Sequence, residues 1–236
     1  MLLESASAAG EHQGKWTPIY TVTVLGLNTG MRHKEIHTLR WKDIDLESGV
    51  LRVAESKTKA GEGRPIPLTQ PACAALQYWA GRFPERLPEH FVFPACENGQ
   101  VDPTRGIAHW RTAWRRITRS IECNCGEIQS SRKICRNVEC GAKIEGLRNP
   151  LEGLRFHDLR HSTATKLLEQ GTPFAVVAQI LGWSASTAVR MAKRYGHIRP
   201  EAQRQALAGV ATQEIQKGVH QFVHQPGRAL QSTLPN

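Results

Sequence analysis

The pattern of apolar and polar positions, together with the prolines and glycines that bound the apolar stretches, predicts a mostly helical chain. The apolar stretch Ile19–Leu27 follows Thr17 and Pro18, which are typical of a helix start, and precedes Gly30, which suits a helix end. Its β-branched residues also fit a strand. A short helix is expected next, around Arg32–Leu39.

Two short runs favour strands instead. Val50–Ala54 and Arg64–Leu68 flank the segment Lys57–Gly63, whose two glycines suit a hairpin turn. Pro71 then opens a further helix that runs through Trp79. We therefore expect a small antiparallel sheet in the amino-terminal part of the chain.

The segment Thr104–Ile121 has the clearest amphipathic pattern and predicts a long helix. Its apolar stripe consists of Ile107, Trp110, Trp114, Ile117 and Ile121. Most of its arginines fall elsewhere on the helical wheel, and we expect four of them to contact DNA phosphates: Arg105, Arg111, Arg115 and Arg119. A solvated polar face explains the same pattern equally well.

Further helices are expected in the last third of the chain. They are His157–Gln170 before Gly171, a short helix capped by Thr172 and Pro173 that ends before Gly182, a helix capped by Ser184 or Ser186 that carries Tyr195, and Glu201–Lys217. The chain is therefore expected to be mostly α with a small antiparallel β-sheet, an α+β fold.

Charge indicates the kind of partner. The 236 residues carry a net charge of +10, and the stretch from Arg105 to Arg160 holds twelve basic and six acidic residues. A concentrated excess of this kind is typical of nucleic-acid binding, although charge that only aids solubility is the alternative.

No apolar run is long enough to span a membrane, and the first residues lack the pattern of a secretory signal, so a cytoplasmic location is expected.

Four of the six cysteines are clustered, which favours a metal site over disulfides in a cytoplasmic protein. They form two loops that each end in Cys-Gly, and four thiolates suit tetrahedral structural zinc: Cys123, Cys125, Cys135 and Cys140. The spacings within the loops, C-x-C and C-x4-C, differ from the usual C-x2-C, and four reduced thiols in a surface loop are the alternative. Catalytic zinc is not expected, because four cysteines close the coordination shell.

The segment Phe156–His161 places His157 and Arg160 on one helical face, where they offer a proton acceptor beside a phosphate-binding guanidinium. Alone, this motif is weak. It occurs together with four others in a fixed order: Thr29-Gly30-Met31-Arg32-His33-Lys34-Glu35, Lys57 in the hairpin turn, Leu181-Gly182-Trp183, and Arg194-Tyr195-Gly196-His197. In that order the residues resemble the catalytic domain of the tyrosine recombinase (phage integrase) family over roughly residues 15–200.

The resemblance implies a site-specific DNA recombinase or integrase, as found in mobile elements. It would cleave and rejoin strands through a 3′-phosphotyrosyl intermediate, without ATP or a catalytic metal. Tyr195 would be the nucleophile, Arg32 and Arg160 would neutralise the phosphate, and Lys57 would be the general acid, with Lys59 as a rival. His157 would help to activate the nucleophile.

Two further roles and two alternatives accompany this hypothesis. Trp183 occupies a position where the family has histidine or tryptophan; its indole N–H can donate to a phosphate oxygen but cannot shuttle protons. Double-stranded DNA and other protomers, assembled as a tetramer on paired sites, are the expected partners. The alternatives are a type IB topoisomerase-like enzyme and a truncated, non-catalytic DNA-binding module.

The resemblance also divides the chain. Family members usually carry an amino-terminal DNA-clamping domain, which suggests that this chain is a fragment. The expected parts are a remnant of a truncated first helix at 1–14, the catalytic domain at 15–200, a zinc-ribbon-like insertion at 122–148, a helix that docks on a partner protomer at 201–224, and a flexible tail at 225–236.

Overall fold

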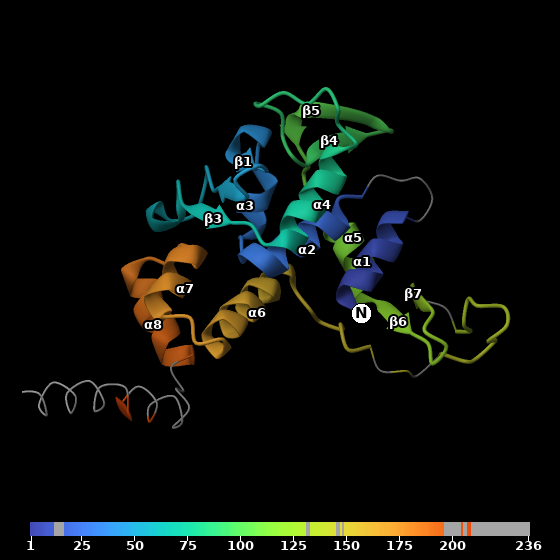
Figure 1. Ribbon diagram of the computed structural model, residues 1–236. Helices are drawn as coiled ribbons and strands as arrows, with labels where there is room; N and C mark the ends of the chain where they lie inside the picture. Colours follow the sequence, from blue (N-terminus) through green and yellow to red (C-terminus); the bar gives the residue numbers. More distant parts are fainter. Residues whose placement is uncertain are drawn as a thin grey trace, which may run out of the picture. The chain divides into compact units, whose positions relative to one another are not determined.

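The computed structural model describes residues 1–11, 17–130, 133–144, 147, 149–195, 204, 207 and 208 (Figure 1). The chain divides into two compact units, Met1–Ala188 and Val189–Asn236. Most of the regular secondary structure in the described first unit is helical, and three small antiparallel sheets accompany the helices. The expected α+β fold is confirmed.

Helix α2 (Ile19–Thr29) is the centre of the first unit. Helices α1 (Leu2–Glu11), α4 (Gln70–Ala80) and α6 (Phe156–Glu169) all pack against it. Its β-branched content is compatible with a helix, because threonine hydroxyls donate to carbonyl oxygens one turn earlier, as Thr29 does to Leu25 at 2.5 Å. The prediction of a helix at Ile19–Leu27 is therefore confirmed, and the alternative of a strand is wrong.

Gly30 ends α2, as its position in the sequence predicts. It has a left-handed φ of 61°, and its amide donates to the carbonyl of Gly26. A Cβ at Gly30 would lie 2.3 Å from Leu181 Cδ2, so glycine also allows the chain from another part of the fold to approach closely.

The predicted hairpin exists. Strands β2 (Val50–Arg52) and β3 (Pro65–Pro67) pair antiparallel, and Leu51 is paired with Ile66 so that both are buried on one face. β3 is an edge strand, which tolerates its two prolines. The structure adds a strand that the pattern did not predict, β1 (Ile44–Asp45), and a short 3-10 turn, η3 (Lys59–Gly61), between β2 and β3.

The predicted helix Thr104–Ile121 is wrong at both ends. Its first residues belong to strand β5 (Gln100–Gly106), which pairs with β4 (Pro94–Glu97), and its last belong to β6 (Ser120–Glu122), which pairs with β7 (Ile128–Ser130). Only the middle is helical, as α5 (Arg111–Thr118). The β4–β5 turn is Asn98-Gly99, with φ of 52° and 82°, and this strong hairpin signal outweighs the apolar periodicity.

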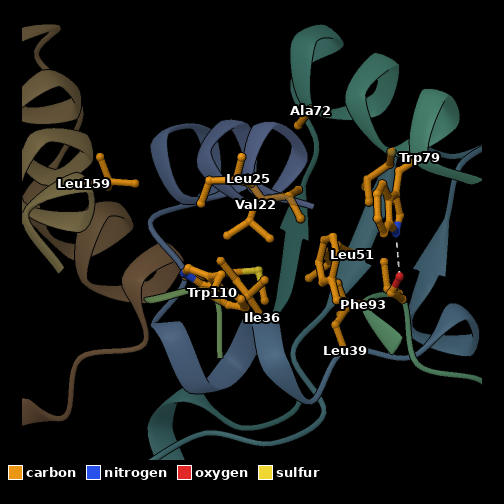
Figure 2. Packing of buried hydrophobic residues seen from close by; sticks show 14 of the residues in the cluster. Val22, Leu25, Ile36, Leu39, Leu51, Ala72, Trp79, Phe93, Trp110 and Leu159 are labelled. Carbon is orange, nitrogen blue, oxygen red and sulfur yellow. Dashed lines mark hydrogen bonds between the residues drawn. The ribbon is translucent and has the colours of Figure 1, made fainter. Parts of the chain in front are cut away.

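A single apolar cluster fills the space between α2, α4, the first sheet and α5. Figure 2 shows side chains from α2, α3 (His33–His37), β2 and α4 meeting there, with the Trp79 indole N–H donating to the carbonyl of Val92 at 2.6 Å. From α5, Trp114 and Ile117 are buried in the same cluster, as is Trp110 just before it. The central part of the predicted stripe is thus confirmed, which leaves the opposite face of α5 to its arginines.

The carboxy-terminal helices begin and end close to the predicted positions. They are α6, α7 (Phe174–Leu181) and α8 (Ala185–Tyr195). Ser184 caps α8, since its Oγ accepts from the amide of Thr187. The expected helix Glu201–Lys217, the docking segment 201–224 and the tail 225–236 lie outside the described residues, apart from 204, 207 and 208.

The expected domain boundaries stay predictions. Residues 2–11 form α1, and Ala6 of this helix is fully buried in the main cluster. Among the described residues, no helix combines the length and the apolar character that crossing a bilayer requires.

Candidate active site

The carboxy-terminal end of α7 gathers arginines from three distant segments. The last carbonyls of a helix have no partner within the helix and carry partial negative charge. Here Arg64 Nε donates to the Ile180 carbonyl at 2.9 Å, and Arg160 Nη2 donates to the Leu181 carbonyl. Arg32 Nη2 donates to the carbonyl of Gly182 at 3.4 Å. One helix end therefore holds three guanidinium groups close together.

Arg32 is fixed from the other side by Glu35. It is the amino-terminal cap residue of α3, where its backbone amide donates to Glu35 Oε2 at 2.8 Å and its Nη1 donates to Glu35 Oε1 at 2.7 Å. Ser56 Oγ accepts from the same Nη1 at 3.2 Å. The side chain of Arg32 is 19% exposed, so it is held firmly while part of it faces solvent.

Glu35 is the counter-charge of the cluster, and its side chain is 1% exposed. Burial by itself raises the pKa of Glu35. Hydrogen bonds from the Arg64 guanidinium, the Ser56 hydroxyl and the Arg32 amide outweigh burial and lower that pKa to about 2. Glu35 is therefore ionised in the folded protein down to strongly acidic pH.

We expect the Glu35 carboxylate to make the free energy of unfolding decrease as the pH falls into the acidic range. Because its pKa falls from 4.5 to about 2 on folding, its contribution is present above pH 4.5 and is lost as the pH falls towards 2. The shift corresponds to about 3 kcal/mol. Chemical denaturation at a series of pH values should show this loss in wild type and not in Glu35→Gln. Glu85→Gln, at an exposed carboxylate, is the matched control and should keep the wild-type profile. An acid loss of equal size in Glu35→Gln would contradict the assignment.

Arg160 joins two helix ends. It lies on α6, is 5% exposed, and its Nη1 donates to the carbonyl of Gly30 at 2.7 Å. Since its Nη2 donates at the end of α7, the guanidinium spans the ends of α2 and α7. On the same helix, Thr163 Oγ1 donates to the Leu27 carbonyl at 3.0 Å and fixes α6 against α2.

The hairpin turn that carries Lys57 is attached to this cluster by the residues on both sides of it. Ser56 Oγ donates to Glu35 Oε1 at 2.6 Å, and Thr58 Oγ1 donates to the carbonyl of Gly182 at 3.2 Å. Lys57 itself is exposed between them. Lys59 is also exposed, but it begins the 3-10 turn beyond these two anchors.

His157 and Trp183 lie beside the cluster. Partial burial, followed by the charges of His161 and Arg160, lowers the pKa of His157, so its imidazole is neutral at neutral pH. Trp183 is partly buried, and its ring packs 5.7 Å from that of Phe174. His157 is therefore close enough for the charges of Arg160 and Arg32 to act on it, and Trp183 directly follows Gly182, whose carbonyl accepts from Arg32.

Tyr195 is the last residue of α8 and belongs to the second unit, Val189–Asn236. The role of Tyr195 as the nucleophile stays a prediction. The structure brings together Arg32, Arg160, the Lys57 turn, His157 and Trp183 within the first unit.

Arg64 and Ser56 are the members of this cluster that the sequence analysis missed. Arg64 donates to both oxygens of Glu35, at 2.7 and 3.1 Å. A signal was present in the strand pattern: side chains alternate between the faces of a strand, so Arg64 shares the buried face with Ile66. A charge in that position requires a buried partner.

The arginines predicted to contact DNA do not form one set. Arg111, Arg115 and Arg119 lie in α5 or at its end and are exposed. Arg105 lies instead on β5, where it pairs with Glu97 at 3.1 Å, so its predicted place on the same helix is wrong. The helical row is therefore Arg111, Arg115 and Arg119, with Arg116 beside it.

The four clustered cysteines converge. Their Sγ atoms all lie within 4.8 Å of one another; Cys123 and Cys140 are 3.7 Å apart, and Cys125 and Cys135 are 3.6 Å apart. A tetrahedron of thiolates around zinc has sulfur–sulfur edges of about 3.8 Å. The donor set and its geometry fit a tetrahedral metal ion.

Each pair of cysteines is shaped by a glycine turn. Gly126 has a φ of 86° and donates to the Cys123 carbonyl at 2.8 Å, and Gly141, with a φ of 55°, donates to the Asn137 carbonyl at 3.2 Å. A backbone hydrogen bond from Glu127 lowers the pKa of Cys125 to about 7. Two turns of unequal length can therefore present four sulfurs to one centre.

Comparison with known proteins places the chain in a family. The profile of the phage integrase family matches residues 4–202. The chain therefore belongs to the phage integrase family, whose members are the tyrosine recombinases, and the resemblance found in the sequence is confirmed.

Individual relatives agree. The chain is similar to the integrase of Salmonella phage P22, with 24% identity over 185 residues that cover 78% of this chain and 40% of the relative. It is also similar to a shufflon-specific DNA recombinase of Escherichia coli, with 30% identity over 182 residues that cover 77% of this chain and 35% of the relative. The chain thus spans less than half the length of these curated relatives.

Solved structures share the fold. The structure of the Tn1549 transposon integrase in complex with circular intermediate DNA covers 88% of this chain and 64% of its own chain, with a TM-score of 0.56 and 19% sequence identity. The mostly helical architecture with small antiparallel sheets is therefore that of tyrosine recombinases.

Proposed function

We propose that this chain is the catalytic part of a site-specific DNA recombinase that cleaves and rejoins strands through a 3′-phosphotyrosyl intermediate. The observation that carries the proposal is the convergence at the end of α7, where Arg32, Arg160 and the turn of Lys57 are bound to neighbouring carbonyl oxygens. Two guanidinium groups beside a lysine and a neutral histidine suit an anionic phosphodiester.

In the proposed reaction, the Tyr195 hydroxyl attacks phosphorus and the bond to the 5′ oxygen breaks. Arg32 and Arg160 neutralise the charge that builds up on the non-bridging oxygens. His157, whose lowered pKa keeps the ring unprotonated before the reaction, accepts the tyrosine proton, and Lys57 donates a proton to the departing 5′ oxygen. Trp183 donates its indole N–H to a phosphate oxygen. The phosphotyrosyl bond keeps the energy of the broken bond, so a 5′-hydroxyl can reseal the strand without ATP.

A nicked duplex that loses its short 5′-hydroxyl fragment after cleavage tests this proposal. Wild-type protein should become attached to the 3′-phosphate end and migrate as an adduct that resists denaturant. If the protein binds DNA but forms no adduct, the result would instead support the non-catalytic DNA-binding module.

Double-stranded DNA is the proposed partner. We propose that the reaction takes place in the cytoplasm, with four protomers assembled on paired sites. The Tn1549 transposon integrase, a structural neighbour, is in complex with DNA in its solved structure.

DNA binding by this chain should be weak, tolerant of sequence and sensitive to salt. Phosphate contacts give a slope of about −0.9 each in log K against log salt, so six contacts lose roughly a thousandfold in affinity between about 50 and about 200 mM salt. Replacing Arg111, Arg115 and Arg119 by glutamine should flatten that slope. Replacing Lys42, Arg82 and Arg86 by glutamine matches the change in charge away from α5 and should leave the slope near wild type. A nanomolar, site-selective and salt-insensitive complex would contradict this expectation.

We also propose that Cys123, Cys125, Cys135 and Cys140 bind one structural zinc ion. The mutual distances of their sulfurs support this, and Cys123 and Cys135 are buried with Ile144 in a small cluster separate from the main core. Zinc would cross-link the two turns and would not take part in strand transfer, because four thiolates complete its coordination.

The zinc proposal predicts a measurable metal content. Purified protein should contain about one zinc per chain. Cys125→Ser and Cys140→Ser should lose it, whereas Cys73→Ser and Cys96→Ser, at cysteines outside the cluster, should keep it. A chelator should increase hydrogen exchange in residues 120–148 without unfolding the main core. Protein that carries no zinc after expression in zinc-replete medium would contradict the assignment.

A further inference from the structure

Arg64 contacts three separate parts of the fold with one guanidinium group. It donates to both carboxylate oxygens of Glu35, to the Gly61 carbonyl at 2.6 Å from Nη1, and to the Ile180 carbonyl at 2.9 Å from Nε. Its side chain is 5% exposed. A buried charge satisfied in this way is fixed in position and does not itself reach a bound strand.

Each of these contacts lies next to a residue with a proposed role. Glu35 is the partner of Arg32. Gly61 belongs to the turn that presents Lys57, and Ile180 is three residues before Trp183. Arg64 thus connects the phosphate clamp, the general acid and the indole donor, which come from three separate segments.

The hairpin and the end of α7 approach too closely for side chains. A Cβ at Gly182 would lie 2.6 Å from Gly61 Cα and 2.9 Å from Arg64 Nη1, and Gly182 has a left-handed φ of 58°. A Cβ at Gly61 would lie 2.4 Å from Ser56 Oγ and 3.0 Å from Arg64 Nη1. Two glycines therefore leave room for the arginine that joins the two segments.

Lysine cannot replace these contacts. Arginine carries five N–H donors in a rigid planar fork, and the contacts of Arg64 use three of its nitrogens in different directions. An ammonium group is a point donor on a flexible stem. Arg64→Lys therefore keeps the charge beside Glu35 while releasing the hairpin, the end of α7 or both.

We propose that Arg64 is a positioning residue that places the Lys57 ammonium at the departing 5′ oxygen by fixing the hairpin to Glu35 and to the end of α7. The inference rests on the proposed function and adds to it a residue that does not touch DNA. Proton donation is sensitive to position, and a displacement of about 1 Å can cost about a hundredfold in rate. Loss of Arg64 is therefore expected to slow cleavage mainly because the departing 5′ oxygen is protonated less efficiently.

The test compares two leaving groups. In a nicked substrate whose 5′ bridging oxygen is replaced by sulfur, a thiolate departs without a proton, since thiols have a pKa of about 8.5. Single-turnover adduct formation at saturating DNA should be about a hundredfold slower for Arg64→Lys than for wild type on the oxygen substrate, and within a fewfold of wild type on the sulfur substrate. Lys57→Ala should behave in the same way.

Three variants define the comparison. Arg86→Lys, at an exposed arginine that donates to the carbonyls of Ala80 and Phe83 and not to the hairpin, should match wild type on both substrates. Arg160→Lys should be slow on both, because charge on the phosphate still needs neutralising. Thr58→Val, which loses only the donation to the Gly182 carbonyl, should show a smaller defect that sulfur also corrects; it preserves the test if Arg64→Lys does not fold.

Hydrogen exchange supplies a second readout that does not depend on activity. Residues 56–63 and 180–183 should exchange faster in Arg64→Lys than in wild type or Arg86→Lys. A defect of equal size on both substrates, no defect, or unchanged exchange in these segments would overturn the proposal. Failure of the wild type to form an adduct would overturn the proposed function instead, while the exchange data would still decide whether Arg64 anchors the hairpin.

Discussion

Tyr195→Phe is expected to abolish covalent attachment of the protein to DNA while leaving DNA affinity close to wild type. The substitution removes one oxygen atom, and no other group can replace it as the nucleophile in the proposed reaction. Because phosphate contacts dominate DNA affinity, loss of a single hydroxyl should change binding little. The measurement is adduct formation on the nicked duplex, together with a titration of the same duplex.

Tyr78→Phe is the matched control. Tyr78 is an exposed tyrosine on α4, where Arg82 donates to its hydroxyl at 2.9 Å. This variant should form the adduct at the wild-type rate. An adduct that persists in Tyr195→Phe at the wild-type rate would show that Tyr195 is not the nucleophile.

Arg32→Lys and Arg160→Lys are expected to slow adduct formation by about a thousandfold or more. Each keeps a positive charge but loses the planar fork that can bind two phosphate oxygens at once. The loss should appear in the rate at saturating DNA, because the charge on phosphorus oxygens grows in the transition state.

Arg155→Lys is the control for these two variants. Arg155 caps α6 near Arg160, but its side chain is 79% exposed and pairs with Asp158. It should match wild type in rate. Because Arg160 is buried, the melting temperature of Arg160→Lys must be measured alongside. A folded Arg32→Lys or Arg160→Lys protein that forms the adduct within tenfold of the wild-type rate would contradict the proposal that these two arginines neutralise the phosphate.

The helices of this fold were predictable because their signals are local. Proline at a helix start marked α2, α4 and α7 closely, and a following glycine marked the ends of α2 and α7. The helix predicted at Thr104–Ile121 is wrong at its start, because the prediction used the apolar periodicity and did not consider the turn that precedes the segment. The Asn98-Gly99 turn commits the following residues to pairing with β4, which a helical spacing within the segment cannot reveal.

The residues of the candidate site were predictable as a set of motifs, whereas their connections were not. The sequence order indicated Arg32, Lys57 and Arg160, but the groups that hold them are the carbonyl oxygens of Leu181 and Gly182. Backbone carbonyls at a helix end carry no sequence signature. Only the three-dimensional path of α7 makes the Gly182 carbonyl a partner of Arg32 and Thr58, which lie 150 and 124 positions before it.

The cysteines present the opposite case. Their spacing departs from the usual knuckle and by itself left the metal site open. The structure brings the four sulfurs within 4.8 Å of one another because glycines in left-handed conformations close both turns. Turn geometry, more than the number of residues between ligands, decides whether such a set can surround one ion.

The central claim is that Tyr195 becomes linked to DNA, and peptide mapping of the adduct tests it most directly. The chain contains three tyrosines, Tyr20, Tyr78 and Tyr195, so a nucleotide remnant left after digestion of the DNA can be assigned to one of them by mass spectrometry. The account predicts that the peptide containing Tyr195 carries the remnant through a 3′-phosphate. A remnant on the peptide of Tyr20 or Tyr78, or on a residue other than tyrosine, would contradict it.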